Sequence, residues 1–340
     1  MTGLHIDIDL GRDAAANRRA TWLLAALALA NLAAWGWAWS AFHGRPAMLG
    51  LAMLAYTFGL RHALDADHIA AIDNVTRKFV QEGRRPVGVG FFFSIGHSTV
   101  VVAACICIAL ASTTVQAHLG ALQTFGAVAG ALVSASFLFT VATANLGALF
   151  GGGRRRTSGH HHDDLQPRGL LGRLIQPVLG FVSSSWRMAP VGLLFGLGFD
   201  TASEVGLLGL SAAHASGSTP ISSIMVFPAL FAAGMSLLDS IDSVMMLKAY
   251  AWALVKPKRK LYYNRTVTAL SVLLAFGVGL IELLDLLRSR VELGGRFWRL
   301  VGQLSDHTEI MGAAIVAVFA LLWGAAALLA KVQNGKESSI

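Results

Sequence analysis

The sequence has 340 residues, of which 55% are hydrophobic and only 14% are charged, whereas an average soluble domain has about 25% charged residues. This composition excludes an ordinary soluble globular protein, because there are too few charged side chains to cover its surface. The formal net charge is +8, but the basic residues lie in short segments between long apolar blocks. That distribution indicates orientation in a membrane and excludes a nucleic-acid-binding protein.

The apolar blocks are long enough to cross a bilayer, which takes about 20 residues of α-helix. The sequence therefore predicts an all-α polytopic membrane protein with eight transmembrane helices. A polar segment, 1–19, precedes the first helix, and a short tail, 331–340, follows the last. The predicted helices cover residues 20–42, 48–73, 87–111, 120–150, 189–213, 222–252, 265–286 and 308–330.

Lysine and arginine alternate between the predicted loops. They are frequent after the second, fourth and sixth helices, whereas the loops 112–119 and 214–221 contain none. Under the positive-inside rule, this alternation predicts that both termini are cytoplasmic and that the chain lies in the cytoplasmic (inner) membrane. Segment 287–307 departs from the pattern, because it carries four arginines although the helix count places it outside.

The longest connector, 151–188, separates helices 1–4 (20–150) from helices 5–8 (189–330). It contains His160, His161 and His162, followed by two aspartates. We interpret it as a cytoplasmic linker whose histidines attract metal ions, in which case a cytoplasmic metal acceptor is a partner to expect. A solvated polar loop with no such role is the alternative.

Two pairs of short segments indicate an internal repeat. Phe58–His62 resembles Phe195–Phe199 at an offset of 137 residues, and Gly96–Ser98 resembles Gly234–Ser236 at an offset of 138. Three predicted helices separate the copies, so the copies run in opposite directions across the membrane. Transporters built from such inverted repeats hold their substrate near the bilayer midplane, where the copies meet.

The second predicted helix carries a dense set of ionisable residues. Each charged side chain at the middle of a bilayer costs about 2.5–3.5 kcal/mol on insertion scales. On a regular helix, His62, Asp65 and His68 share one face about 120° wide, whereas Asp67 lies on the other side. Two imidazoles and a carboxylate suit a first-row divalent metal ion. The helical geometry thus favours Asp65 over Asp67 as a ligand.

Further ligands must come from other helices, because one helix cannot enclose an ion. His97 in the third helix is the best candidate, although a single intramembrane histidine is often only a hydrogen-bonded packing residue. Two acidic pairs at helical spacing, in the fifth and sixth helices, have three interpretations. They can take up protons, help to bind the cation, or form ion pairs with Arg61 or Lys248. The pairs are Asp200 with Glu204, and Asp239 with Asp242.

Four stretches of the chain resemble the motifs of the nickel/cobalt transporter (NiCoT) family. The first is the signature His62-Ala-Leu-Asp65-Ala-Asp67-His68, and the other three occur in the family's order. They are Phe93–Val101, Leu197–Glu204 and Gly234–Asp242. The resemblance implies eight spans, cytoplasmic termini and uptake of Ni²⁺ or Co²⁺ by one polypeptide. It also implies that His62, Asp67 and His68 are essential, so both Asp65 and Asp67 remain candidate ligands.

We therefore expect a secondary transporter, a permease that takes up nickel or cobalt and binds the ion near the bilayer midplane. The ion is the transported substrate, and no cofactor and no enzymatic activity are expected. Two alternatives use the same residues: a metal exporter, and an intramembrane metalloenzyme. The enzyme is disfavoured, because the chain lacks a His-Glu-x-x-His motif and no nucleophile stands beside a base.

Overall fold

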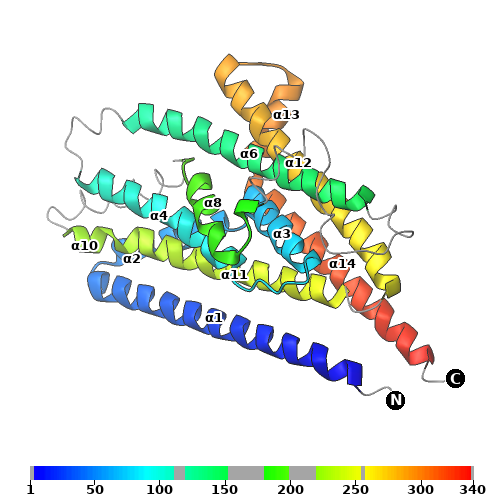
Figure 1. The fold of residues 1–340 in the computed structure, drawn as a ribbon. Helices are drawn as coiled ribbons and strands as arrows, with labels where there is room; N and C mark the ends of the chain where they lie inside the picture. The colour runs from blue at the N-terminus through cyan, green and yellow to red at the C-terminus, as the bar shows by residue number, and fades with distance from the viewer. Residues whose placement is uncertain (1–3, 111–118, 152–179, 199–219, 254–256, 338–340) are drawn as a thin grey trace.

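The computed structural model describes residues 4–110, 119–151, 180–198, 220–253 and 257–337. Within these ranges the chain consists of helices and turns, with no strand (Figure 1). The helices are α1 (Leu4–Phe42), α2 (Pro46–His62), α3 (Ala66–Gln81), α4 (Val89–Leu110), α6 (Leu119–Gly151), η1 (Ser185–Arg187), α8 (Met188–Phe195), α10 (Ile221–Ile224), α11 (Val226–Ala253), α12 (Pro257–Val291), α13 (Arg296–Ser305) and α14 (Thr308–Glu337).

In the described part of the chain, five helices are long and apolar enough to cross a membrane, and two bent pairs raise the number to seven. The bent pairs are α2 with α3, at 50°, and α13 with the first part of α14, at 69°. The predicted all-helical membrane protein is thus confirmed. The count of eight stays a prediction, because most of the fifth predicted helix, 189–213, lies outside the described residues.

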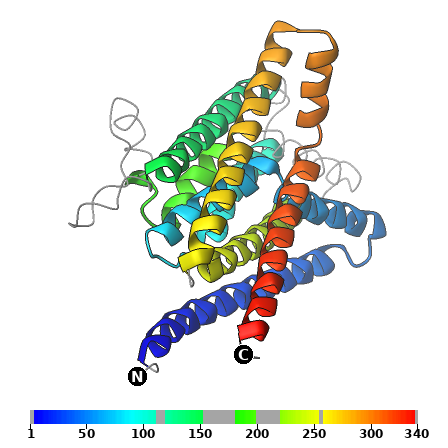
Figure 2. The same ribbon diagram turned by 90° about the vertical axis from the view of Figure 1, so that its right-hand side faces the viewer.

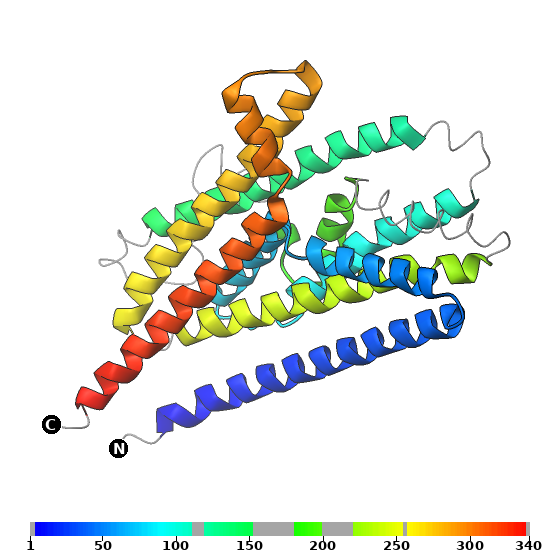
Figure 3. The same cartoon turned by 180° about the vertical axis from the view of Figure 1, so that it is seen from behind.

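The long helix α1 forms one edge of the bundle and lies along α11 (Figure 1). Asn31 of α1 donates a hydrogen bond from Nδ2 to the carbonyl oxygen of Ala233, at 3.1 Å. The start of α1 and the end of α14 lie at the same end of the molecule, and the α12–α13 turn lies at the opposite end (Figures 2 and 3).

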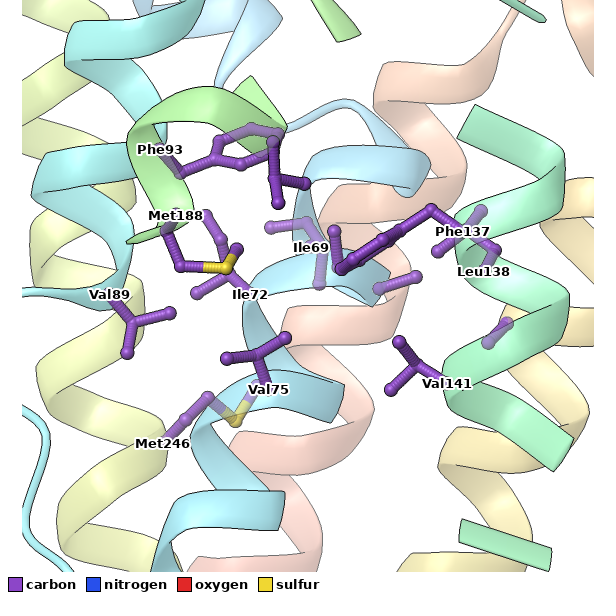
Figure 4. Packing of buried hydrophobic residues seen from close by; sticks show 14 of the residues in the cluster. Ile69, Ile72, Val75, Val89, Phe93, Phe137, Leu138, Val141, Met188 and Met246 are labelled. Carbon is purple, nitrogen blue, oxygen red and sulfur yellow. The ribbon is translucent and has the colours of Figure 1, made fainter. Parts of the chain in front are cut away.

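Helix α3 lies at the centre of the bundle, in contact with α4, α6, α11, α12 and α14. Of its 16 residues, 13 are buried. Ile69, Ile72 and Val75 pack into an apolar cluster (Figure 4). Their neighbours come from three sides: Phe93 of α4 with Met188 of α8, Met246 of α11, and Phe137, Leu138 and Val141 of α6. Close packing of this kind stabilises helix association in lipid, where the hydrophobic effect contributes little between helices.

Buried polar contacts also fasten α3 to its neighbours. Arg77 forms an ion pair with Asp73 on the same helix, with 2.8 Å between Nη2 and Oδ2, and the hydroxyl of Tyr250 on α11 donates to the same carboxylate. Asn145 of α6 donates to Asn74 Oδ1 at 2.7 Å. These contacts account for Asp73 as a structural residue, because a buried charge must be paired to be tolerated.

Candidate metal site

The second predicted membrane span is not one helix. Helix α2 ends at His62, the chain turns through Ala63 and Leu64, and α3 begins after Asp65. Asp65 has extended backbone angles (φ −61°, ψ 139°), the conformation of a residue that precedes a helix, where aspartate is favoured. The prediction of a continuous helix over 48–73 is therefore wrong, and with it the assignment of faces on a regular helix.

The break changes which side chains meet. On an intact helix, His62 and His68 would be about 9 Å apart along the axis and about 120° apart around it. Across the break their rings lie 4.7 Å apart, centroid to centroid. His97 of α4 completes the group, with ring centroids 4.8 Å from His62 and 4.7 Å from His68. We call these three residues the histidine cluster.

The histidine cluster is suited to binding a transition-metal ion. One ring nitrogen from each residue lies within 4.8 Å of the other two, and the Nε2 atoms of His62 and His97 are 3.0 Å apart. Two ligands about 2.1 Å from one ion and at right angles to each other are about 3 Å apart. His68 and His97 are 1% and 4% exposed. His68 Nε2 is buried and has no hydrogen-bond partner among the described residues, so it is able to act as a ligand.

Asp239 of α11 lies behind His68. Its Oδ2 is 3.5 Å from His68 Nδ1 and accepts a hydrogen bond from the hydroxyl of Ser94 at 2.6 Å. A carboxylate next to one imidazole nitrogen favours the tautomer that carries its proton there, which leaves the lone pair of Nε2 for an ion. Asp239 thus supports the cluster from behind, and neither it nor Asp242 lines the cavity described next.

The histidine cluster opens into a cavity of about 350 Å³ between α2, α3, α4, α6, α8, α12, α13 and α14. Asp65 and Asp67 both line it. Asp65 Oδ2 accepts a hydrogen bond from Thr308 at 3.1 Å. Asp67 accepts one from the backbone N–H of His68 at 2.7 Å, and Ser134 Oγ lies 3.3 Å from its other oxygen. Both carboxylates are therefore next to the cluster but outside its group of closely spaced ligand atoms.

Other predicted site residues are not brought into this group. Asp242 is buried on α11, and neither of its carboxylate oxygens has a hydrogen-bond partner in the described part of the chain. Arg61, an expected partner of the acidic pairs, forms an ion pair with Glu309, with 2.6 Å between Nη2 and Oε1. Asp200, Glu204 and His160–His162 lie outside the described residues, so their roles stay predictions.

Three acidic residues of the cavity were not predicted as site residues. Glu282 and Asp285 come from α12, and Glu309 comes from α14. A signal for Glu282 and Asp285 is present in the sequence, because both lie in the apolar block 265–286 and ionisable residues inside a membrane span are commonly functional. Glu309 lies at the edge of its block and gives only a weak signal.

Comparison with known proteins identifies relatives of this chain. A family model described as "High-affinity nickel-transport protein" (NicO) matches residues 48–329. The "High-affinity nickel transport protein" of Cupriavidus necator is 48% identical over 328 residues, which cover 94% of this chain and 93% of that protein. No solved structure matches the chain.

Relatives named for either metal are similar over most of their length. The "Nickel transporter NixA" of Staphylococcus aureus is 41% identical over 93% of this chain and 96% of its own. The "Cobalt transport protein NhlF" of Rhodococcus rhodochrous is 42% identical over 84% of this chain and 85% of its own. These relatives are transporters and not enzymes, with the metal ion as substrate. The chain therefore belongs to the NicO family of high-affinity nickel-transport proteins, as the resemblance of its motifs indicates.

Proposed function

We propose that the chain is a permease of the cytoplasmic membrane that takes up Ni²⁺ or Co²⁺, and that the histidine cluster binds the ion partway across the bilayer. The observation that carries the proposal is the meeting of His62, His68 and His97 across a broken helix, at one side of a cavity lined by carboxylates. Imidazole binds both metals well. His62 is the last residue of α2, where the negative end of the helix dipole favours a cation.

Helix contacts support the inverted repeat on which this transport mechanism depends. The repeat relates α2 to α8 and α4 to α11. Gly59 and Gly234 lie where α2 approaches α11, and their repeat equivalents, Gly196 and Gly96, lie where α8 approaches α4. The repeat therefore relates the α2–α11 interface to the α8–α4 interface. Two equivalent interfaces around one central site are suited to alternating access, in which the site is exposed to each side of the membrane in turn.

The membrane potential favours uptake. Moving one charge through 100 mV is worth about 2.3 kcal/mol, so a divalent ion that moves into a negative interior gains about 4.6 kcal/mol. Both termini at one end of the molecule (Figure 2) support an even number of crossings. We place them in the cytoplasm because the basic loops predict it.

The test is uptake of radioactive ⁶³Ni²⁺ by cells that express the chain, with excess Co²⁺ as competitor. We expect cells with the unaltered protein to accumulate nickel, and His97→Ala to reduce uptake at low nickel concentration at least about tenfold, because loss of one of the few metal ligands costs 10-fold or more in affinity. His43→Ala is the matched control, since His43 is exposed in the turn between α1 and α2.

The outcomes separate the alternatives. Equal uptake by His97→Ala and His43→Ala would exclude the histidine cluster as the binding site. Cells that hold less nickel than cells without the protein would indicate export, in which case the same mutation should restore the nickel content. Competition by Co²⁺ measures which metal the chain prefers.

A further inference from the structure

The cavity extends well beyond the histidine cluster. Helix α12 lines it with one face over about 16 Å, the rise of eleven residues. Residues at helical spacing form this face: Val278, Ile281, Glu282, Asp285, Leu286 and Ser289. Thr308 and Glu309 of α14 and Ser305 of α13 line it as well. An ion that enters from the α12–α13 end would pass these groups before it reaches the imidazoles.

Five carboxylates of the described residues line the cavity, and two of them are neutralised by ion pairs. Glu309 pairs with Arg61. Asp285 pairs with Arg288, with 2.8 Å between Nε and Oδ1, and also accepts a hydrogen bond from Ser305 at 3.0 Å. The other three carboxylates are Asp65, Asp67 and Glu282, and no lysine or arginine of the described chain forms an ion pair with them. We call these three residues the acidic antechamber.

When ionised, the carboxylates of the acidic antechamber have no lysine or arginine partner among the described residues. The positive end of the α3 dipole, close to Asp65 and Asp67, amounts to about half a charge. Ser134 Oγ lies 3.3 Å from Asp67 Oδ2, and Ser134 lines the cavity together with Glu282. Glu282 Oε2 is buried and has no hydrogen-bond partner among the described residues. An oxygen in this condition is costly unless a ligand satisfies it.

The ligand that suits these groups is a hydrated divalent cation. Carboxylate and hydroxyl oxygens accept hydrogen bonds from the water of a hydrated ion and can replace some of that water. Six waters occupy about 180 Å³ at about 30 Å³ each, which is less than the 350 Å³ of the cavity. The histidine cluster, by contrast, offers nitrogen ligands in a buried position where the ion must lose water.

We propose that the acidic antechamber is a second cation site, in which Glu282 captures the hydrated divalent ion together with Asp67 and Asp65 before it reaches the histidine cluster. This inference rests on the proposed function, since it requires that the ion proceeds to the imidazoles. Glu282 lies outside the four recognised sequence motifs and comes from α12, a helix that contributes nothing to the cluster itself.

The experiment measures initial rates of ⁶³Ni²⁺ uptake into liposomes that contain the purified full chain, over a range of Ni²⁺ concentrations and at two ionic strengths. Glu282→Gln keeps the shape of the side chain and removes its negative charge. We expect its KM to rise about five- to tenfold at low ionic strength, because one nearby charge no longer attracts the ion. The difference should shrink at high ionic strength as salt screens the remaining charges. We expect kcat to change less than about twofold, since imidazole binding is intact.

Two variants control for charge and for folding. Glu292→Gln removes the same charge from an exposed position just beyond the end of α12 and should leave KM unchanged. Glu282→Asp retains the charge and should keep KM close to that of the unaltered protein. The visible absorption spectrum of bound Co²⁺ reports on the histidine cluster, and at saturation it should be the same in Glu282→Gln as in the unaltered protein.

The results distinguish failure of the inference from failure of the proposed function. If the unaltered protein transports nickel and Glu282→Gln has the KM of Glu292→Gln, the antechamber is wrong and the transporter stands. If Glu282→Gln changes the Co²⁺ spectrum, Glu282 belongs to the histidine site itself and a separate second site is also wrong. If the unaltered protein neither binds nor transports nickel, the proposed function has failed.

Discussion

Asp239 illustrates how a residue that orients a metal ligand can affect the affinity of the histidine cluster for the ion. It is fully buried, and its carboxylate lies between the hydroxyl of Ser94 and the ring of His68. Its charge favours the His68 tautomer that presents Nε2 to an ion. The carboxylate therefore supplies orientation from α11, although it does not line the cavity.

We expect Asp239→Asn to weaken Ni²⁺ binding about 10- to 100-fold, the usual cost of losing the partner of a metal-binding histidine. The measurement is calorimetric titration of the purified protein with Ni²⁺. Ser94→Ala, which removes only the hydrogen bond to the carboxylate, should have a smaller effect, and Asp306→Asn on the exposed α13–α14 turn should have none. Unchanged affinity in Asp239→Asn would show that His68 is oriented without this carboxylate.

At the scale of helices, the sequence was sufficient to find most spans and insufficient to find the break. The apolar blocks agree with α1, α4, α6, α11, α12 and α14, because length and hydropathy are local properties. The interruption at Ala63–Asp65 contains neither glycine nor proline, and Asp65, a residue type favoured before a helix, is its one local sign. It is held by tertiary contacts, such as Thr308 with Asp65 and Arg61 with Glu309.

The sequence was likewise sufficient for some residues of the candidate site and insufficient for others. The sequence predicts a shared site for His62, His68 and His97, because ionisable residues inside a membrane are costly and rare. The structure places their rings 4.7–4.8 Å apart, and their binding of a metal ion stays a prediction. The choice between Asp65 and Asp67 rested on a regular helix that does not exist. Glu282 was missed, since its distance from His62 in the sequence gives no sign that α12 packs beside α3.

Close contact between helices positions His97. Its neighbour Gly96 lies so near α8 that a Cβ there would overlap the carbonyl of Ala189. We expect Gly96→Ala to lower the free energy of unfolding by about 1–3 kcal/mol, the usual cost of overpacking, and to weaken Ni²⁺ binding as α4 shifts. Thermal unfolding in detergent and Ni²⁺ titration measure the two effects.

The matched control is Gly50→Ala in α2, where a Cβ would meet nothing within 4 Å. It should raise stability by about 0.5–1 kcal/mol, because alanine favours a helix more than glycine does. Equal melting temperatures for the two variants would contradict the packing argument.

At the scale of the whole molecule, the α12–α13 end of the cavity lies away from the end of the bundle that carries the two termini. The cavity reaches Ser289 in the last turn of α12. The α12–α13 turn that follows lies at the end of the bundle away from the start of α1 and the end of α14 (Figures 2 and 3). Cytoplasmic termini would thus make this structure open to the outside, with the basic segment 287–307 outside as well. That placement contradicts the positive-inside rule for one loop, but the other loops outweigh it.

Cysteine labelling tests this orientation. In a background in which Cys105 and Cys107 are replaced by alanine, Ser289→Cys should react with a membrane-impermeant thiol reagent added to intact cells. Saturating Ni²⁺ should slow the reaction at least about twofold, because the bound ion and its water occupy the cavity. Arg18→Cys, at an exposed position of α1 just before the predicted span 20–42, should react only after the cells are permeabilised. The reverse pattern would place the termini outside, so the acidic antechamber would face the cytoplasm, where it would collect metal for export.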